Sequence, residues 1–333
     1  MWVKKPRLSM LDLVPVREGG TVREALDIAV QTAQKAEELG FVRYWLAEHH
    51  NMPGIASSAT AVLIGHIAGK TERIRVGSGG IMLPNHAPLV VAEAFGTLAE
   101  LYPGRIDLGL GRAPGTDGAT MRALRRDRLE TEEDFPRDVA ELQRLLGPAD
   151  PQARISATPG ADTHIPIWLL GSSLYSAQLA AMKGLPYAFA SHFAPRFLHQ
   201  AIAMYRQLFR PSAVLDKPYV MVGVPVVAAP TDEEAQYLAT SSQQRVLGIL
   251  TGQRGKMPPP LEGFMQMIGP REQAAINDFL AMSVVGSEET VRQGFARIQQ
   301  QCEADELILV SDVYDPALRL RSLEIAAQAV AKS

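Results

Sequence analysis

The densest group of ionisable side chains in the sequence is the run Glu48, His49, His50 and Asn51, directly after the apolar residues Tyr44–Ala47. Histidine titrates near neutral pH, so a histidine placed here can act as an acid, a base or an anion stabiliser. For either histidine alone, a hydrogen bond to a neighbouring loop explains its presence equally well. The segment is therefore a candidate for proton-transfer chemistry, with a structural role as the alternative.

Three glycines, Gly77, Gly79 and Gly80, stand at the end of the next apolar run. Glycine costs backbone entropy there that an ordinary strand end avoids. One interpretation is that a large ligand approaches the backbone closely. The other is a bulge or a tight turn before Pro84, and the residues themselves leave both open.

Arg112 ends the segment Asp107–Arg112, whose glycine spacing begins like a dinucleotide-binding fingerprint. Pro114 occupies the place of the third glycine and no helical pattern follows at once, so that interpretation fails. An arginine at a strand end suits a phosphate or a carboxylate instead, because its planar guanidinium binds their oxygens in pairs.

Hydroxyl groups are concentrated in the segment Gly171–Ser176, at Ser172, Ser173 and Ser176. Small residues, hydroxyls and the free N–H groups of a helix start are the components of an anion site. A capping role explains one serine but not three serines together with the glycine. Combined with Arg112, the segment favours a phosphate as the ligand.

Short apolar runs alternate along the chain with longer amphipathic segments, as is typical of parallel βαβ units. Eight runs predict strands, which is the number that closes a (β/α)8 TIM barrel with its active site at the carboxyl ends of the strands. The four polar groups described above all follow predicted strands. The predicted strands are Leu8–Val14, Arg43–Ala47, Ile74–Ile81, Ile106–Leu110, Ile167–Leu170, Tyr187–Ala190, Tyr219–Val227 and Glu306–Val310. The predicted helices are Val22–Leu39, Ser57–Lys70, Ala87–Leu101, Pro136–Leu146, Ser173–Lys183, Pro195–Phe209, Asp232–Leu250, Glu288–Cys302 and Pro316–Ala331.

We expect a single barrel domain over residues 1–333, because α/β barrels of this length form one unit. Two segments are too long for simple connections, and we interpret them as insertions. The first spans residues 113–135 after the fourth strand, and the second spans residues 252–271 after the seventh. The second contains Pro258–Pro260 and is predicted to be a loop that covers a pocket.

The composition is that of an ordinary globular protein, with 47% hydrophobic and 21% charged residues. A formal charge of -3 argues against a surface for nucleic acid. The single cysteine, Cys302, excludes an intramolecular disulfide and favours a reducing compartment. The first apolar stretch is short and is interrupted by Asp12 and Pro15, unlike a signal peptide or a membrane span. We expect a cytoplasmic protein that binds neither nucleic acid nor membranes.

In this order, the four polar groups resemble those of the bacterial luciferase-like flavin-dependent oxidoreductases, and within them a subgroup of single-chain bacterial members. The resemblance runs over nearly the whole chain. It implies a barrel that binds reduced FMN or, in some branches, the deazaflavin F420 at the strand ends. The segments that carry the resemblance are Ala47–His50, Gly77–Pro84 with His86 and Pro88, Tyr102–Arg112, Gly171–Ser173 and Ser283–Val291.

The resemblance also implies roles for individual residues. Gly79 and Gly80 fall where the family often has a non-proline cis peptide beside the flavin ring. Glu48 and His49 match the pair near the reactive edge of that ring, where His49 would be the base or the hydrogen-bond donor that supports a C4a-peroxyflavin. The positions that hold the flavin phosphate in the family match Arg112, Ser172, Ser173 and Ser176.

These roles lead to an FMN-dependent monooxygenase that acts on a small organic substrate with O2. A separate flavin reductase would supply the reduced FMN, because the sequence contains no nicotinamide fingerprint. An F420-dependent hydride-transfer oxidoreductase on the same fold is the alternative. The resemblance further implies a homodimer that forms through helices beside the early strands.

Two other classes of function compete with a flavin enzyme. A metal-dependent barrel hydrolase would use some of the seven histidines. Its ligands would lie two apart on a strand so that both face inward, whereas His49 and His50 are adjacent and diverge, so we expect no metal. A flavin-binding protein without turnover is not distinguished by the sequence.

Overall fold

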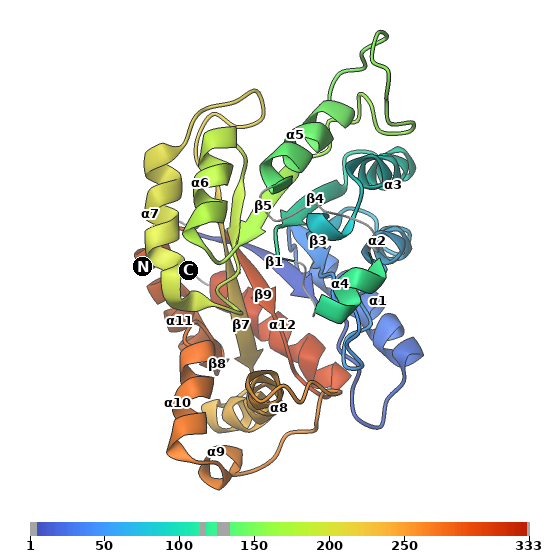
Figure 1. Cartoon of the computed structure of the whole chain (residues 1–333). Helices are drawn as coiled ribbons and strands as arrows, with labels where there is room; N and C mark the ends of the chain where they lie inside the picture. The colour runs from blue at the N-terminus through green and yellow to red at the C-terminus, as the bar shows by residue number, and fades with distance from the viewer. Residues whose placement is uncertain (1–4, 114–117, 125–133, 332–333) are drawn as a thin grey trace.

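A computed structural model describes residues 5–113, 118–124 and 134–331 of the chain. Among these residues, eight parallel strands close into a barrel, because β6 pairs with β7 as well as with β5 (Figure 1). The (β/α)8 fold and the eight strands predicted from the sequence are therefore confirmed. The strands of the barrel are β1 (Arg7–Asp12), β2 (Arg43–Leu46), β3 (Arg75–Met82), β4 (Ile106–Gly111), β5 (Ile167–Gly171), β6 (Tyr187–Phe189), β7 (Val220–Ala228) and β9 (Glu306–Val310).

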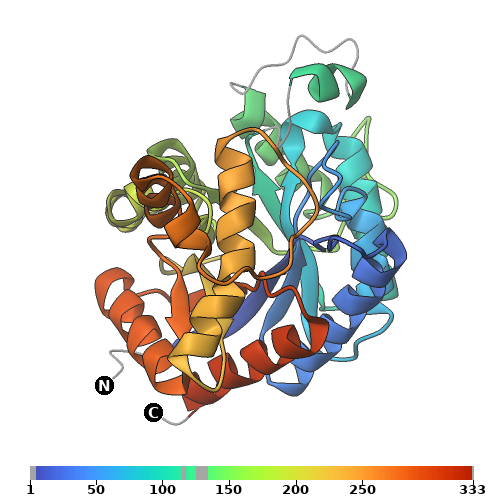
Figure 2. The ribbon, with the colours of Figure 1, turned by 90° about the horizontal axis from the view of Figure 1, so that it is seen from below.

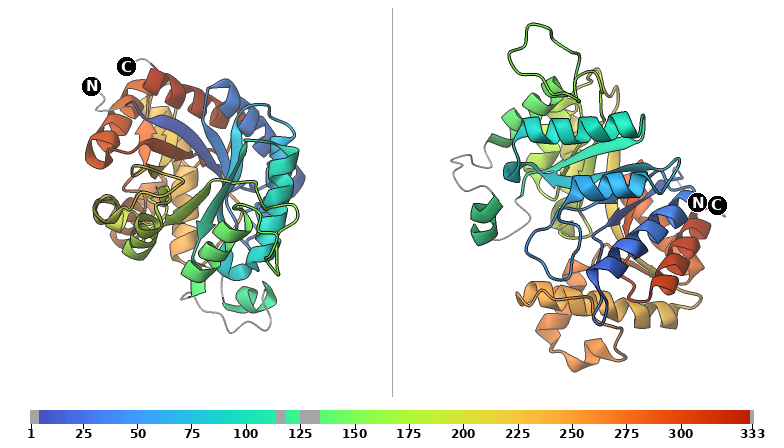
Figure 3. Two further views of the ribbon diagram at one scale, coloured as in Figure 1. Left: turned by 90° about the horizontal axis from the view of Figure 1, so that it is seen from above. Right: turned by 90° about the vertical axis from the view of Figure 1, so that its right-hand side faces the viewer.

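Helices surround the strands on the outside of the barrel, as the view from above shows (Figure 3). Local signals start several of them: Thr21 and Glu24 form a capping box at α1, and the Thr231 side chain accepts from the Glu234 amide at α8. The helices on the barrel wall are α1 (Val22–Glu38), α2 (Thr60–Ala68), α3 (Pro88–Leu101), α5 (Phe135–Leu145), α6 (Leu174–Lys183), α7 (Leu198–Leu208), α8 (Asp232–Leu250), α11 (Glu288–Cys302) and α12 (Pro316–Ala331), with 3-10 turns η1 (Leu83–Asn85) and η3 (Pro195–Phe197).

Four further elements were not predicted from the sequence. A short strand, β8 (Val284–Gly286), pairs with the carboxyl end of β7 in register Val226 to Val284. Helix α4 (Gly118–Leu124) lies in the first insertion, of which residues 114–117 and 125–133 are outside the described residues. The prediction of a plain loop over residues 252–271 was wrong in part, because α9 (Phe264–Met267) and the start of α10 (Pro270–Phe279) lie in this segment.

The apolar side chains divide into an outer and an inner layer. The outer layer packs the strands against the helices and holds large buried side chains such as Phe95 of α3 and Phe295 of α11. The inner layer fills the barrel and includes Trp45, Trp168 and Ile308. Trp45 and Trp168 meet edge to face with their centroids 5.2 Å apart, so the barrel interior is filled with side chains below the strand ends.

Buried charges close the amino end of the barrel. Arg43 donates to Glu306 at 2.7 Å and to Asp107 at 2.8 Å, while Arg75 donates to Asp107 at 2.6 Å and the Tyr219 hydroxyl donates to Glu306 at 2.9 Å. Burial alone would lower the pKa of Arg43, but the carboxylates of Glu306 and Asp107 raise it. We call these five residues the amino-end charge network.

Within the described ranges, no helix combines the length and the apolar character that a membrane span requires.

Candidate active site

A cavity of about 900 Å³ opens at the carboxyl ends of the strands. Its volume is in the range of small-molecule and cofactor sites, about 300–1,000 Å³. Residues that lie in or shortly after five different strands contribute to its wall, among them His49, Gly80, Arg112, Ser172 and Val310. Part of α8 and the segment that follows it cover the other side, and Figure 2 shows both in front of the barrel strands. The predicted pocket cover is thus present in residues 252–258.

The glycines of β3 have two structural explanations. The register between β3 and β4 shifts between Ser78 and Ile81, so the bulge considered for this segment is present. A Cβ on Gly77 would lie 2.5 Å from the Asp107 carbonyl oxygen, so close strand packing accounts for that glycine. Gly79 and Gly80 also line the cavity, and the peptide bond between them is cis. Backbone without side chains therefore faces the cavity here.

Arg112 and Ser172 line the cavity near the start of α6. The Arg112 guanidinium lies 4.5 Å from the centre of the Tyr175 ring, so that ring supports it. Because α6 begins at Leu174, its free N–H groups lie beside these two side chains. A guanidinium, a hydroxyl and a helix start are the donor set that a phosphate requires.

Ser173 and Ser176 are engaged in the first turn of α6. The Ser173 side chain caps the helix by accepting from the Ser176 amide, and the Ser176 hydroxyl donates to the Ser173 carbonyl at 2.8 Å. Ser176 Oγ also lies 3.1 Å from the Tyr187 hydroxyl. Of the three serines predicted for this site, Ser172 is therefore the one among the residues that line the cavity. The other two shape the helix start that lies beside it.

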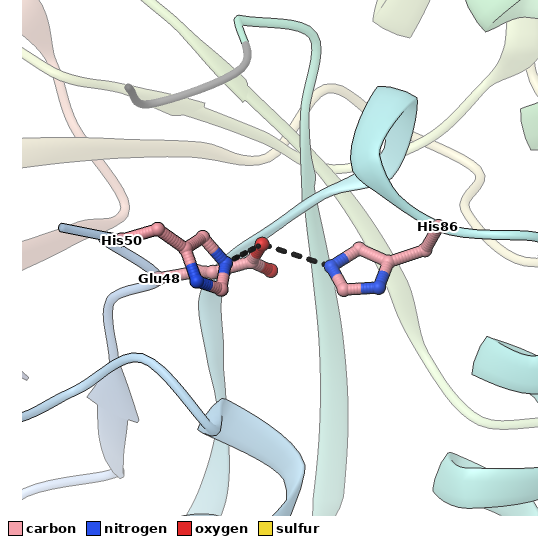
Figure 4. Close-up of side chains that lie close together, drawn as sticks. All are labelled: Glu48, His50 and His86. Carbon is pink, nitrogen blue, oxygen red and sulfur yellow. Dashed lines mark hydrogen bonds and ion pairs between the residues drawn. The ribbon is translucent and has the colours of Figure 1, made fainter. Parts of the chain in front are cut away.

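Glu48 is buried between two histidines that come from different strand ends (Figure 4). Its Oε1 accepts hydrogen bonds from His50 Nε2 at 2.9 Å and from His86 Nε2 at 2.8 Å, and its Oε2 accepts from the Met82 amide at 3.0 Å. Burial raises the pKa of the Glu48 carboxyl, but the hydrogen bonds from His86, His50 and Met82 outweigh burial and hold the pKa below its ordinary value. Glu48 is thus an ionised carboxylate that joins β2 to η1.

The structure gives Glu48 and His49 different surroundings, although the sequence predicted them as a pair. His49 lies in the cavity wall and its amide donates to the Ser57 carbonyl. His86 was missed as a site residue. It lies 38 positions beyond Glu48, so only the conjunction of Pro84, His86 and Pro88 in one motif could have drawn attention to it.

The ligand atoms of Glu48, His50 and His86 all lie within 4.8 Å of one another, a spacing that a metal ion could bridge. Of the two adjacent histidines, only His50 belongs to this group, because His49 lies in the cavity wall. The second histidine of the group, His86, comes from the next strand end. The same distances also fit two hydrogen bonds from the histidines to Glu48 Oε1, and these bonds compensate the buried charge of the carboxylate.

Three cavity residues were not singled out from the sequence: His192, Arg245 and Asp312. Arg245 of α8 donates to Asp312, which follows β9, at 2.6 Å. This ion pair joins the helix that covers the cavity to the barrel beneath it. The sequence did not indicate these three residues as a group because each lies far from the other two along the chain.

A parallel barrel with a cavity at its strand ends is an arrangement typical of enzymes that act on small molecules. Residues 7–302 match the family of luciferase-like monooxygenases. A luciferase-like monooxygenase of Escherichia coli K12 is 52% identical over 318 residues, which cover 96% of this chain and 95% of the relative. The N-acetyl-S-alkylcysteine monooxygenase of Bacillus subtilis is 30% identical over 341 residues, covering 97% and 98% of the two chains. The chain belongs to the luciferase-like monooxygenase family.

Solved structures share the same fold. The structure of apo-MsnO8 has a TM-score of 0.92 and 36% identity, with 98% of this chain and 99% of that chain covered. The oxygenating constituent of 3,6-diketocamphane monooxygenase from Pseudomonas putida, solved in complex with FMN, has a TM-score of 0.75 at 17% identity over 99% of both chains. An F420-dependent secondary alcohol dehydrogenase has a TM-score of 0.70 at 15% identity over 98% and 99%. The last two similarities are evidence of fold alone.

Proposed function

We propose that the protein is an FMN-dependent monooxygenase that uses reduced FMN and O2 to oxidise a small organic substrate. The observation that carries this proposal is the meeting of three features in one cavity. These are the side-chain-free backbone at Gly79 and Gly80, the Arg112 guanidinium, and Ser172 at the start of α6. Membership of the luciferase-like monooxygenase family supports it.

The residues of the cavity fit a flavin phosphate and ring. Arg112, the Ser172 hydroxyl and the N–H groups of α6 would hold the phosphate, with Ser173 and Ser176 fixing the first turn of that helix. A Cβ on Gly80 would lie 2.8 Å from the Gly109 carbonyl oxygen of β4, so close strand packing excludes a side chain there. The bare backbone of Gly79 and Gly80 lines the cavity, where a planar ring would pack against it. Reduced flavin supplies the electrons with which O2 is activated.

The protein's own acid-base groups would act beside the end of β2. His49 is positioned to donate or accept a proton there, because it lines the cavity directly after β2. Glu48 contributes by fixing the backbone around Met82 and the ring of His86 through its hydrogen bonds. The buried carboxylate thus makes the β3 end of the cavity rigid.

An F420-dependent hydride-transfer oxidoreductase is the second candidate. The cavity volume of about 900 Å³ is within the usual range for cofactor sites, and one structure of the same fold is an F420-dependent dehydrogenase. Reduced FMN for the first candidate would come from a separate reductase.

Parallel reconstitution tests these functions. FMN and F420 are titrated into the protein separately, with binding measured by fluorescence quenching, and O2 consumption is then measured with reduced FMN and a panel of small organic compounds. We expect tight FMN binding and substrate-dependent O2 consumption. Preferential F420 binding would establish the second candidate, and flavin binding without turnover would indicate a binding protein. Stoichiometric zinc by elemental analysis would point to the hydrolase class instead.

We also propose a homodimer that forms through α2 and α3. These neighbouring helices expose apolar side chains at Val62, Val90 and Leu101. Single exposed apolar residues are common, but three on two adjacent helices form a surface suited to a second copy. Sedimentation that showed only a 36.2 kDa species would exclude this dimer.

A further inference from the structure

His192 is a cavity residue with no role in the function proposed above. It follows β6 and lies in the same wall region as Ala190. Its Nδ1 is a buried atom that has no hydrogen-bond partner among the described residues. Buried polar atoms are nearly always paired, so an unpaired nitrogen in a cavity wall requires an explanation.

The backbone of β7 forms a seat for the His192 ring. A Cβ on Gly223 would lie 2.4 Å from His192 Nδ1, so only glycine leaves room for the ring at this position. The neighbouring Ser191 hydroxyl donates to the Gly223 carbonyl and fixes the segment on β7. A glycine inside a buried strand weakens the strand. Here its effect is to let the imidazole pack directly against the backbone.

This seat selects one protonation state of the ring. A proton on Nδ1 would be a buried donor without an acceptor, which is costly, whereas a bare Nδ1 is the lesser cost. This arrangement therefore favours the tautomer with its proton on Nε2, the ring nitrogen farther from Gly223. Burial lowers the pKa of His192 to about 4, with Asp312 opposing and His49 reinforcing this shift. Asp312 is itself paired with Arg245.

We propose that His192 uses its Nε2–H to donate a hydrogen bond to a carbonyl oxygen of the ligand in the cavity and thereby orients that ligand. A neutral N–H donor pairs with an uncharged carbonyl oxygen without leaving a net charge buried in the cavity wall. The assignment rests on the proposed function, because the carbonyl belongs either to the flavin ring or to the organic substrate. His192 is in both cases a binding residue rather than an acid or a base.

The ligand-free protein gives the first test. Long-range 1H–15N NMR spectra of the histidine rings distinguish a protonated ring nitrogen from a bare one, and loss of signals in His192→Gln assigns this ring. We expect the neutral Nε2–H form from pH 8 down to about pH 5. A proton on Nδ1, or a positive charge on the ring at neutral pH, would overturn the proposal. This test does not depend on which cofactor the protein binds.

Binding measurements separate the two sources of the carbonyl. His192→Ala should raise the FMN dissociation constant about fivefold if the acceptor is on the flavin. If the acceptor is on the substrate, FMN affinity stays unchanged and the dissociation constant for the probe cyclohexanone, measured calorimetrically with and without FMN, rises about fivefold instead. Unchanged affinity for both overturns the proposal. Wild-type protein that binds cyclohexanone but neither FMN nor F420 would refute the proposed function alone.

Two further variants separate ligand binding from a structural role. His192→Gln retains an N–H donor and should recover part of the lost affinity, whereas a packing role would not be rescued. Gly223→Ala should displace the ring and reduce affinity as His192→Ala does. In the His192→Ala background the same Gly223 change has no ring to displace, so its further effect should be small, because only the Phe189 carbonyl oxygen, 3.3 Å from the new Cβ, remains close. If the two affinity losses added in the double variant, the proposed contact between the His192 ring and the Gly223 backbone would be contradicted.

Discussion

The buried polar groups at the two ends of the barrel differ in how completely they are hydrogen-bonded. At the amino end, Arg43 is bonded to both Glu306 and Asp107, and each of these carboxylates has a further partner. At the carboxyl end, the cavity wall holds His192 with a nitrogen that lacks a partner among the described residues. Saturated bonding leaves no capacity for a ligand, so the amino end serves stability. Unused bonding capacity beside a cavity is what a ligand can complete.

The largest effect is expected from breaking the amino-end charge network. Arg43→Met keeps a similar volume but leaves the buried Glu306 carboxylate without its cation. Removing one partner of a buried pair costs about 3–5 kcal/mol, and we expect the free energy of unfolding in urea to fall by that amount. Arg23→Met, at an exposed position of α1, is the matched control and should change it by less than about 0.5 kcal/mol. Equal losses in the two variants would mean that the network adds nothing specific.

The next effect concerns turnover at the carboxyl end. His49→Ala should slow substrate oxidation about 10²- to 10⁴-fold, the usual contribution of a positioned acid or base, while the flavin still binds. Steady-state O2 consumption with reduced FMN measures the rate, and flavin fluorescence measures binding. His66→Ala, an exposed histidine on α2, is the control and should retain the wild-type rate. Normal turnover without His49 would remove it from the mechanism.

Affinity for the flavin should depend on Arg112. Its replacement by alanine removes a charge-assisted contact and should weaken FMN binding by about 1.5–3 kcal/mol, with the free energy of unfolding little changed. For Arg43→Met we expect the reverse, a large loss in the free energy of unfolding. Fluorescence titration gives the dissociation constant, and Arg23→Ala serves as the control. An unchanged constant would place the phosphate elsewhere.

The sequence predicted the fold well because all eight barrel strands are apolar runs with distinct boundaries. It missed β8 because Ser283 and Gly286 leave only two consecutive apolar residues there, whereas the equally short β6 lies in a longer apolar run. It placed Arg112 and Ser172 at the ends of two successive strands; these strands are neighbours in the barrel and both residues line the cavity. It could not place His86 beside Glu48 or His192 against Gly223, because these contacts depend on the exact path of loops after the strands.

Glu48 is the exception that sharpens the comparison between the two ends, because it lies at the carboxyl end yet is bonded as completely as the amino-end charge network. Its pKa in the folded protein lies below the ordinary value of 4.5. A carboxyl of this kind stabilises the fold above its unfolded-state pKa, and the contribution is lost as the pH falls through the folded-state pKa. Glu48→Gln should therefore be less stable than wild type by about 1 kcal/mol at pH 7.

The pH dependence of that difference is the decisive measurement. Urea unfolding of both proteins from pH 7 to pH 3 should show the gap between them shrinking once the pH drops below about 4.5, as the wild-type carboxyl becomes protonated. Glu100→Gln, an exposed change on α3, controls for the loss of one surface charge and should show almost no gap at any pH. A gap of constant size across this range would mean that packing of the side chain, and not its ionised hydrogen bonds to His50 and His86, stabilises the β3 end of the cavity.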